Sequence, residues 1–368
     1  MTATGARGAR RDRPATAPLV VAMAPMPSPK GNPFVRQMAE QLRHQGCEVT
    51  PFSLAAARRA DVLHLHWPDH FVNRASAWSG VRGAAKVVLC CLVARARSRA
   101  VVWTVHNLKP HDARHPWLER VFWPVFTALL TGSICLTSAG RSLALARFPR
   151  LRRKPCEVIA HGSYAGVYPP HPGDRLAARA GLGLPADSSP LLFFGQIRPY
   201  KNVPGLLRAF AAVDDDTARL VVAGECPDAA HAQALHEEAG RDGRVIMTGR
   251  VADEDVQRAF AASVGVVLPY LDVFNSGSLF LALSLGRPSL VPRTSVFAEI
   301  RQQVGAEWLT FFDPPLDPTS LAAFTSQARE LTDAGTRPDL SAYDWEVLGE
   351  QIVRFYRSLL VGGPGRPR

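Results

Sequence analysis

The sequence predicts an α/β protein of two domains, each built on a doubly wound parallel sheet. Short β-branched runs alternate with helix-length segments along the 368-residue chain, as they do in βαβ units. The alternation is interrupted once, at the proline-rich stretch 163–190, and then resumes. The chain is also longer than one hydrophobic core usually serves, so we expect two domains.

Each predicted strand is a short apolar run of the kind that is buried on both faces of a parallel sheet. In the first half the runs lie at 19–24, 61–67, 100–106, 133–138 and 156–162. In the second half they lie at 191–195, 218–224, 244–249, 264–270 and 288–292. The last segment, YDWEVLGEQIVRFYRSLL, spaces its apolar residues as a helix does. The predicted order is therefore two strand–helix series followed by one long helix.

Composition narrows the class of protein. With 47% hydrophobic and 20% charged residues the chain is typical of globular proteins, and no apolar run approaches the ~20 residues of a membrane-spanning helix. Residues 1–18, rich in Arg, Ala and Pro, predict a disordered leader rather than a signal peptide. Six scattered cysteines, without metal-ligand or redox spacing, predict free thiols in a reducing compartment. We therefore expect a cytoplasmic protein.

One basic segment accounts for the net charge of +11. Residues 82–154 hold fourteen Lys or Arg against two acids, Asp112 and Glu119, and they include the aromatic stretch RHPWLERVFWPVFTALL. Such a face suits an anionic membrane surface, a phosphorylated acceptor or nucleic acid, with an ordinary solvated surface as the alternative. Because no nucleic-acid recognition module is present, we expect no nucleic-acid partner and keep peripheral contact with the inner face of the cell membrane open.

Two polar turns follow strands of the second half, at the carboxyl ends where parallel sheets place their ligands. Arg198 and Lys201 lie in the first turn, and Asn202 is a candidate N-cap for the next helix. The second turn, at 275–278, precedes another helix, whose N-terminal amides attract anions. Together the turns predict a clamp for a diphosphate; solvated surface loops are the alternative.

Histidines end three predicted strands of the first half. His66 closes one strand just before Asp69, His106 closes the next strand, and His161 closes the last. Each alone is more typical of a hydrogen-bonded core histidine, but their shared position at strand ends favours a functional site. No carboxylate or second histidine lies at local ligand spacing, so we predict no metal site.

Several of these segments resemble a known family. FFGQIRPYKNVPGLLRAF, VIMTGRVADEDVQRAFAAS and PYLDVFNSGSLFLALSLGRPSLVP are similar to the carboxyl half of GT-B glycosyltransferases of the group 1 class, which use nucleotide-sugar donors. TVHNLKPHD, VIAHGSY and GNPFVRQMAEQLRHQGCEVTPF are similar to the amino half of that class. The resemblance covers nearly the whole chain from Leu19 to about Leu360.

The resemblance implies a hexosyltransferase with two Rossmann-like domains that face a cleft. Its parts would be a leader at 1–18, an amino-terminal acceptor-binding domain at 19–165, a linker at 166–189, a carboxyl-terminal nucleotide-sugar-binding domain at 190–343 and a helix returning to the first domain at 344–362. The donor residues would be Gly195, Arg198, Lys201, Asn275, Ser276, Gly277 and Ser278, with Glu299 as a candidate for sugar or ribose hydroxyls. The acceptor-side residues would be Gly31, Asn32, His66, Asp69 and His161. The catalytic residues would be His106, Arg198 and Lys201.

The chain departs from the class at three positions. The arginine that usually follows the strand glycine is Gln196 here, which leaves Arg198 as its possible substitute. The class usually has a glutamate before the glycine loop and another eight residues later, and here these positions hold Val273 and Leu281. We expect a retaining, metal-independent transfer with no cofactor to a hydroxyl acceptor, which would be a lipid-linked saccharide, a polysaccharide precursor or a small natural product. An inverting enzyme would need a protein base, for which Asp69, Asp112 and His66 are candidates. The alternatives are a sugar-nucleotide epimerase, a sugar phosphorylase, or a catalytically silent binding protein of the same fold.

Overall fold

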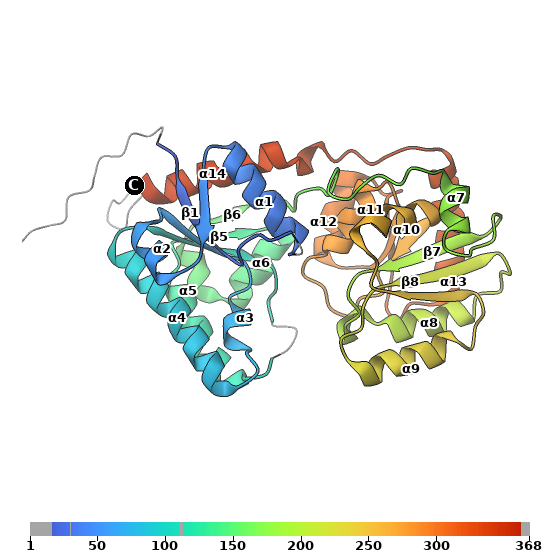
Figure 1. Cartoon of the computed structure of the whole chain (residues 1–368), viewed down its shortest axis with the longest axis horizontal. Coiled ribbons are helices and arrows are strands. Elements are labelled where there is room, and N and C mark those ends of the chain that lie inside the picture. The colour runs from blue at the N-terminus through green and yellow to red at the C-terminus, as the bar shows by residue number, and fades with distance from the viewer. Residues whose placement is uncertain (1–16, 30, 110–112, 362–368) are drawn as a thin grey trace, which may run out of the picture.

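The computed structural model describes residues 17–29, 31–109 and 113–361, which form two α/β domains side by side (Figure 1). Each domain contains one parallel sheet of six strands covered by helices. This confirms the predicted fold class. Most of the expected leader, residues 1–16, lies outside the described residues, as does the candidate base Asp112.

The first sheet has the strand order β2-β1-β3-β4-β5-β6. Its strands are β1 (Val20–Ala24), β2 (Glu48–Pro51), β3 (Val62–Leu65), β4 (Ala100–Val105), β5 (Gly132–Cys135) and β6 (Cys156–Val158). The helices between them are α1 (Pro33–His44), α2 (Leu54–Arg59), α3 (Asp69–Val72), α4 (Ala77–Ala96), α5 (Pro116–Leu129) and α6 (Ser138–Arg147). One apolar core lies on the α2, α4 and α5 face of the sheet, and another lies on the α1 face.

The second sheet has the strand order β12-β11-β10-β7-β8-β9. Its strands are β7 (Ser189–Phe194), β8 (Ala218–Ala223), β9 (Val245–Gly249), β10 (Gly265–Val267), β11 (Ser289–Pro292) and β12 (Leu309–Phe312). The helices are α7 (Arg175–Ala180), α8 (Val203–Ala211), α9 (Ala229–Ala239), α10 (Val256–Ala262), α11 (Gly277–Ser284), α12 (Ser295–Val304) and α13 (Pro318–Asp333). Short 3₁₀ turns at Pro149–Arg153, Pro199–Lys201, Asp253–Asp255 and Ser341–Tyr343 complete the elements.

Each sheet reverses its strand order once, and ligands bind at such reversal points. The first sheet reverses between β1 and β3, and the second between β7 and β10. The loops after β1 and β3 carry Asn32 and Asp69, whereas the loops after β7 and β10 carry Lys201 and the turn at 275–278. The topology therefore brings together the pairs of loops that the sequence singled out separately.

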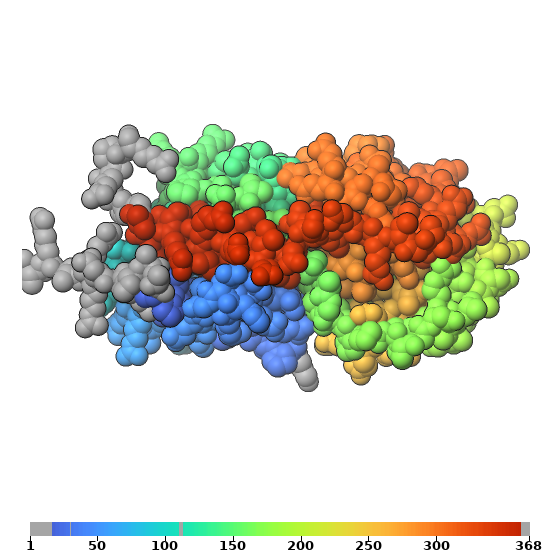
Figure 2. Space-filling view, turned by 90° about the horizontal axis from the view of Figure 1, so that it is seen from above, coloured from blue at the N-terminus to red at the C-terminus, as the bar shows by residue number. Residues whose placement is uncertain are grey.

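The last helix, α14 (Trp345–Val361), returns to the first domain, as Figures 1 and 2 show in red. Its apolar residues Leu348, Ile352 and Tyr356 join the core on the α1 face of the first sheet. The Tyr356 hydroxyl lies 2.6 Å from Nδ1 of the buried His64. At the crossing point the Trp345 Nε1–H donates to the Ser163 carbonyl at 2.9 Å. The helix thus belongs to the core of the domain that it reaches.

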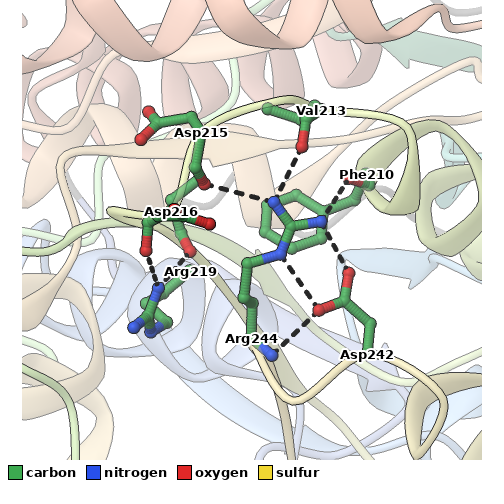
Figure 3. A network of polar contacts seen from close by, with 8 residues as sticks. Phe210, Val213, Asp215, Asp216, Arg219, Asp242 and Arg244 are labelled. Carbon is green, nitrogen blue, oxygen red and sulfur yellow. Dashed lines mark hydrogen bonds and ion pairs between the residues drawn. The ribbon is translucent and has the colours of Figure 1, made fainter.

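An arginine network joins segments of the second domain that lie just before β8 and β9 (Figure 3). The Arg244 guanidinium donates to the Val213 carbonyl at 2.7 Å and to both Asp242 carboxylate oxygens at 3.0 and 2.8 Å. It also donates to the Asp215 carbonyl at 3.1 Å. These bonds join the chain after α8 to the start of β9, so the network is structural.

Helix α4 has an unusually apolar composition for a helix at the surface of a domain. Among the described residues it is the one helix long and apolar enough to cross a membrane by length and composition, with a mean hydropathy of 1.4 in its most apolar window. Only 33% of that window is buried. The buried side packs against α2, α3, α5 and β4, which fixes α4 within the first domain.

Candidate active site

A cavity of about 530 Å³ lies between the loops of the two domains. The first domain lines it with Asn32, Trp67, Asp69, His70, Asn73, Asn107 and Arg114. The second domain lines it with Gln196, Arg198, Tyr200 and Lys201. The cavity therefore combines the predicted diphosphate cations with two of the predicted acceptor-side residues, Asn32 and Asp69.

Gly195 is the point where the loop after β7 meets the start of α11. Its φ of +122° lies in a region that favours glycine. A Cβ atom at this position would lie 2.9 Å from Ser278 Oγ and 3.0 Å from Lys201 Nζ. Residue 195 must therefore lack a side chain for the Lys201 ammonium and the Ser278 hydroxyl to converge here. Both groups suit an anionic oxygen.

The first residues of the turn at 275–278 connect the two domains. The Asn275 side-chain amide donates to the His106 carbonyl at 3.0 Å and to the Val105 carbonyl at 3.3 Å, both at the end of β4. Next to it, Phe274 is buried within the core of the first domain. Ser276 Oγ accepts from the Leu279 amide at 3.2 Å and caps α11, as expected for an N-cap serine. Gly277 faces Tyr164, whose hydroxyl would lie 3.0 Å from a Cβ there.

Glu299 lies away from the main cavity. Its carboxylate accepts from the backbone amides of Ser138 and Ala139 at 2.8 and 2.7 Å, at the start of α6 in the first domain. It lines a separate cavity of about 200 Å³. In this arrangement Glu299 joins the two domains at a helix N-terminus, where a negative charge is favourable.

Asp69 is the carboxylate of the main cavity. It is the first residue of α3 and is only 7% exposed. Burial raises its pKa, because a charged carboxylate loses hydration there, although the neighbouring His70 lowers it. Nearby, Asn32 caps α1 by accepting from the Phe34 amide at 2.9 Å, and Gly31 donates to the Ser28 carbonyl at 2.9 Å. A carboxylate with a raised pKa, facing cations across a cavity, can serve as a general base.

The predicted histidines form a buried group beneath the cavity. His66 Nδ1 lies 3.0 Å from His106 Nε2, and Trp67 stacks on His106 with ring centroids 4.3 Å apart. Burial lowers the pKa of both imidazoles well below its usual range, so both are neutral. Trp67, rather than either imidazole, lines the cavity. These histidines therefore support the cavity wall.

His161 lies at the boundary between the domains. Its ring stacks on Phe280 of α11 with centroids 4.5 Å apart, and its Nδ1 lies 2.8 Å from the Gly162 carbonyl. Burial lowers its pKa to about 4. The side chain therefore packs against α11 of the second domain and does not line the main cavity.

Several residues that line the cavity were not predicted as site residues, chiefly His70, Asn73, Arg114, Gln196 and Tyr200. Their positions carried a weak signal, since Gln196 and Tyr200 flank Arg198 and His70 follows Asp69. Asn73 and Arg114 are far apart in sequence and meet only in the fold, where the Arg114 amide donates to Asn73 Oδ1 at 2.9 Å.

Comparison with known proteins identifies the family to which this chain belongs. Residues 189–329 match the protein family described as "Glycosyl transferases group 1". A GDP-mannose:glycolipid 4-beta-D-mannosyltransferase from Xanthomonas campestris pv. campestris is 32% identical over 354 residues, which cover 95% of each chain. The chain therefore belongs to the group 1 glycosyltransferases of the GT-B fold. It is a hexosyltransferase that moves a sugar from a nucleotide-sugar donor to an acceptor.

Solved structures agree on the fold. Anabaena HepE in complex with UDP and glucose superimposes with a TM-score of 0.67 at 16% identity, covering 92% of this chain and 100% of that one. A sucrose-phosphate synthase from Thermosynechococcus elongatus gives a TM-score of 0.64 at 16% identity, covering 94% and 100%. At this identity the likeness concerns the GT-B architecture.

Proposed function

We propose that this chain transfers mannose from GDP-mannose to a hydroxyl of a lipid-linked saccharide, with inversion at the anomeric carbon. The donor and the class of acceptor are inferred from the Xanthomonas relative, whose name states GDP-mannose and glycolipid and whose match extends over 95% of both chains. The observation that carries the mechanism is the cavity that Asp69 of the first domain and Arg198 and Lys201 of the second line together.

We propose inversion of the anomeric configuration, whereas the sequence led us to expect retention. The mannose of GDP-mannose is α-linked to the diphosphate, so an enzyme that forms a β-mannoside from it inverts the configuration. The name of the Xanthomonas relative describes a β-mannoside product. The two positions where the class usually has glutamates also support the proposal. Val273 packs against the core of the second domain and Leu281 is buried, so neither offers a polar group to the sugar.

Asp69 is the proposed general base. In an inverting transfer the acceptor hydroxyl attacks from the side opposite the leaving diphosphate, and a base on that side takes its proton. Asp69 belongs to the first domain and the cations to the second, which suits opposite sides of the bound sugar. The raised pKa of Asp69 makes its carboxylate a stronger base than an ordinary surface aspartate.

The second domain is proposed to stabilise the leaving group. As the glycosidic bond breaks, negative charge grows on the departing GDP, and fixed positive groups then lower the barrier. Lys201, Arg198 and the amides at the start of α11 supply these groups without a cofactor. Among the described residues no cluster of three or more His, Cys, Asp or Glu could hold a metal ion. We propose metal-independent transfer, for which unchanged activity in EDTA is the direct test.

We also propose that the protein works at the cytoplasmic face of the membrane. A lipid-linked acceptor is held there, and nucleotide sugars are supplied on that side. All six cysteines are free, as a reducing compartment allows. The basic segment 82–154 would then meet anionic lipid headgroups.

The test is transfer from GDP-mannose to a short-chain polyprenyl-diphosphate saccharide, with the anomeric configuration of the product read by NMR. A β-mannoside supports the proposal. An α-mannoside would overturn inversion and the role of Asp69. Transfer from UDP- or ADP-sugars but not from GDP-mannose would overturn the donor assignment.

A further inference from the structure

We propose that the outer faces of α4 and α5 form a docking surface for an anionic lipid bilayer. This surface, the α4–α5 surface, consists of six exposed apolar side chains: Trp78, Leu89, Leu92, Trp117, Val121 and Val125. Their exposed fractions run from 40% to 69%. The inference deepens the proposed function and rests on it in one respect: a lipid-linked acceptor has to reach the cavity from a membrane.

The six side chains form two stripes on neighbouring helices. On α5, Trp117, Val121 and Val125 are four residues apart, so they share one face. On α4, Leu89 and Leu92 follow Trp78 by 11 and 14 positions, which is close to three and four helical turns. The three side chains therefore share the outward face of α4. The opposite sides of both helices are buried in the core of the first domain, where α4 packs against α5. Figure 1 shows α4 along the outer edge of the first domain, away from α14.

Exposed tryptophan and leucine side chains at this density are unusual on a protein surface in water. An amphipathic or apolar helix face with flanking tryptophans is typical of proteins that lie in the membrane interface. The buried side of α4 is part of a folded domain, so the helix cannot leave the domain to span a bilayer. The arrangement therefore fits peripheral insertion of side chains rather than a transmembrane helix.

Charge on the same helices selects an anionic bilayer over another apolar partner. Arg82 and Lys86 of α4 and Arg120 of α5 are exposed among the apolar side chains. The two helices contain one acid, Glu119, whose carboxylate accepts from the Asn73 amide at 2.8 Å. Cations beside inserted apolar groups attract anionic lipids by about fivefold in affinity per residue.

The surface adjoins the cavity. Asn73 and Arg114 line the cavity and are hydrogen-bonded to each other just before α5 begins. Trp117 lies in the first turn of α5, and Trp78 lies in the first turn of α4. The tryptophan end of the surface is thus the end nearest Asp69. A bilayer touching it would present the polar end of an embedded acceptor to the base.

The first experiment measures co-sedimentation of the purified full chain with phosphatidylcholine vesicles, with and without phosphatidylglycerol. We expect association with the anionic vesicles and a blue shift of tryptophan emission, because Trp78 and Trp117 leave water. Trp78→Glu and Leu89→Glu should each weaken the partition at least about tenfold. Leu176→Glu, at an exposed leucine on α7 in the other domain, is the matched control and should bind as the wild type does.

Charge is tested separately with Arg82→Glu and Lys86→Glu, and Arg241→Glu is the control at an exposed site in the second domain. The first two should lower binding to anionic vesicles at least about fivefold each, and the control should not. Thermal unfolding verifies that each variant is folded. If Trp78→Glu does not fold, the milder Trp78→Ser takes its place.

Three results would overturn the proposal. The wild type could remain in solution with both kinds of vesicle, or the variants on α4 could bind as well as the controls. Alternatively, light scattering could show a dimer that Trp78→Glu dissociates, which would identify a second copy of the chain as the occupant. Sugar transfer is not measured in these experiments, so their failure would leave the proposed mannosyl transfer intact.

Discussion

Asp69 and Lys201 line one cavity from two different domains, although 132 positions separate them along the chain. Each side chain alone has an ordinary explanation, a buried carboxylate or a loop lysine. Together they suit the proposed transfer, because a sugar bound between them would have a base on one side and a cation for its leaving group on the other. The reaction proposed for the protein depends on these two residues more than on any others.

Asp69→Asn is expected to abolish transfer and spare donor binding. The amide cannot take the acceptor proton, so kcat should fall by about 10² to 10⁴. The dissociation constant of GDP-mannose, measured by calorimetry, should change little because the cations are untouched. Asp187→Asn, at an exposed aspartate, is the control. Transfer at the wild-type rate by Asp69→Asn would remove the base from the mechanism.

The pH dependence of transfer follows from the same carboxyl. A general base works only when ionised, and burial raises the pKa of Asp69. As the pH falls through that raised pKa, kcat should fall with a slope of one proton. The fall should begin at a higher pH than for an ordinary aspartate. The measurement is a pH–rate profile at saturating substrates, and a profile without an acid limb at pH values where the protein stays folded would contradict the assignment.

At the scale of single elements, the loop after β7 depends on the absence of a side chain. Gly195→Ala should weaken GDP binding on the order of tenfold or more, because the new methyl would meet Ser278 Oγ and Lys201 Nζ and the φ of +122° disfavours alanine. Gly243→Ala is the matched control, since nothing lies within 4 Å of its Cβ. Equal nucleotide binding by both variants would show that the loop tolerates the change.

The hydrogen-bond network of Arg244 contributes to the stability of the second domain. Arg244→Ala leaves the Val213 and Asp215 carbonyls and the Asp242 carboxylate without this donor, which should cost about 2–4 kcal/mol in the free energy of unfolding. Hydrogen bonds from Arg244 lower the pKa of Asp242. The part of the stabilisation that comes from the charged Asp242 carboxylate is therefore complete above its unfolded-state pKa and is lost as the pH falls through the lowered pKa. Urea unfolding of both proteins at neutral and acidic pH should show this gap narrowing in acid.

The elements show what the sequence could predict. Continuous apolar runs identified ten strands, but β2 and β12 were missed. β2 is half-exposed with a mixed sequence, and β12 contains two half-buried residues, so neither forms a continuous buried run. Asn202 does precede α8, yet its φ of +53° is left-handed and its side chain makes no capping bond. Local sequence patterns predict burial and the starts of helices. The strands β2 and β12 and the conformation of loops depend instead on tertiary contacts.

The sequence likewise predicts some features of the candidate site and not others. Arg198, Lys201 and Asp69 could be predicted to line the cavity because they follow the carboxyl ends of predicted strands, and Asn32 was implied by the family resemblance. The hydrogen bonds that Asn275 and Glu299 make to the other domain, to His106 and to Ser138 and Ala139, could not be predicted from the sequence. Contacts across domains leave no periodic signal in the chain.

At the scale of the whole molecule, several contacts join the two domains, some beside the main cavity and others away from it. Asn275 holds the end of β4, Glu299 holds the start of α6, and α14 packs into the first domain. These contacts hold the loops after β7 and β10 close to the loops of the first domain. In the proposed reaction, donor and acceptor meet in the cavity between them.

The most direct test of this account is calorimetric titration of GDP into the wild type and into Lys201→Ala, with UDP as the competing nucleotide. We expect saturable binding of GDP in preference to UDP, weakened on the order of a hundredfold by Lys201→Ala and unchanged by Arg208→Ala on the neighbouring helix α8. Binding of GDP that is as tight to Lys201→Ala as to the wild type, or no binding to either, would contradict it.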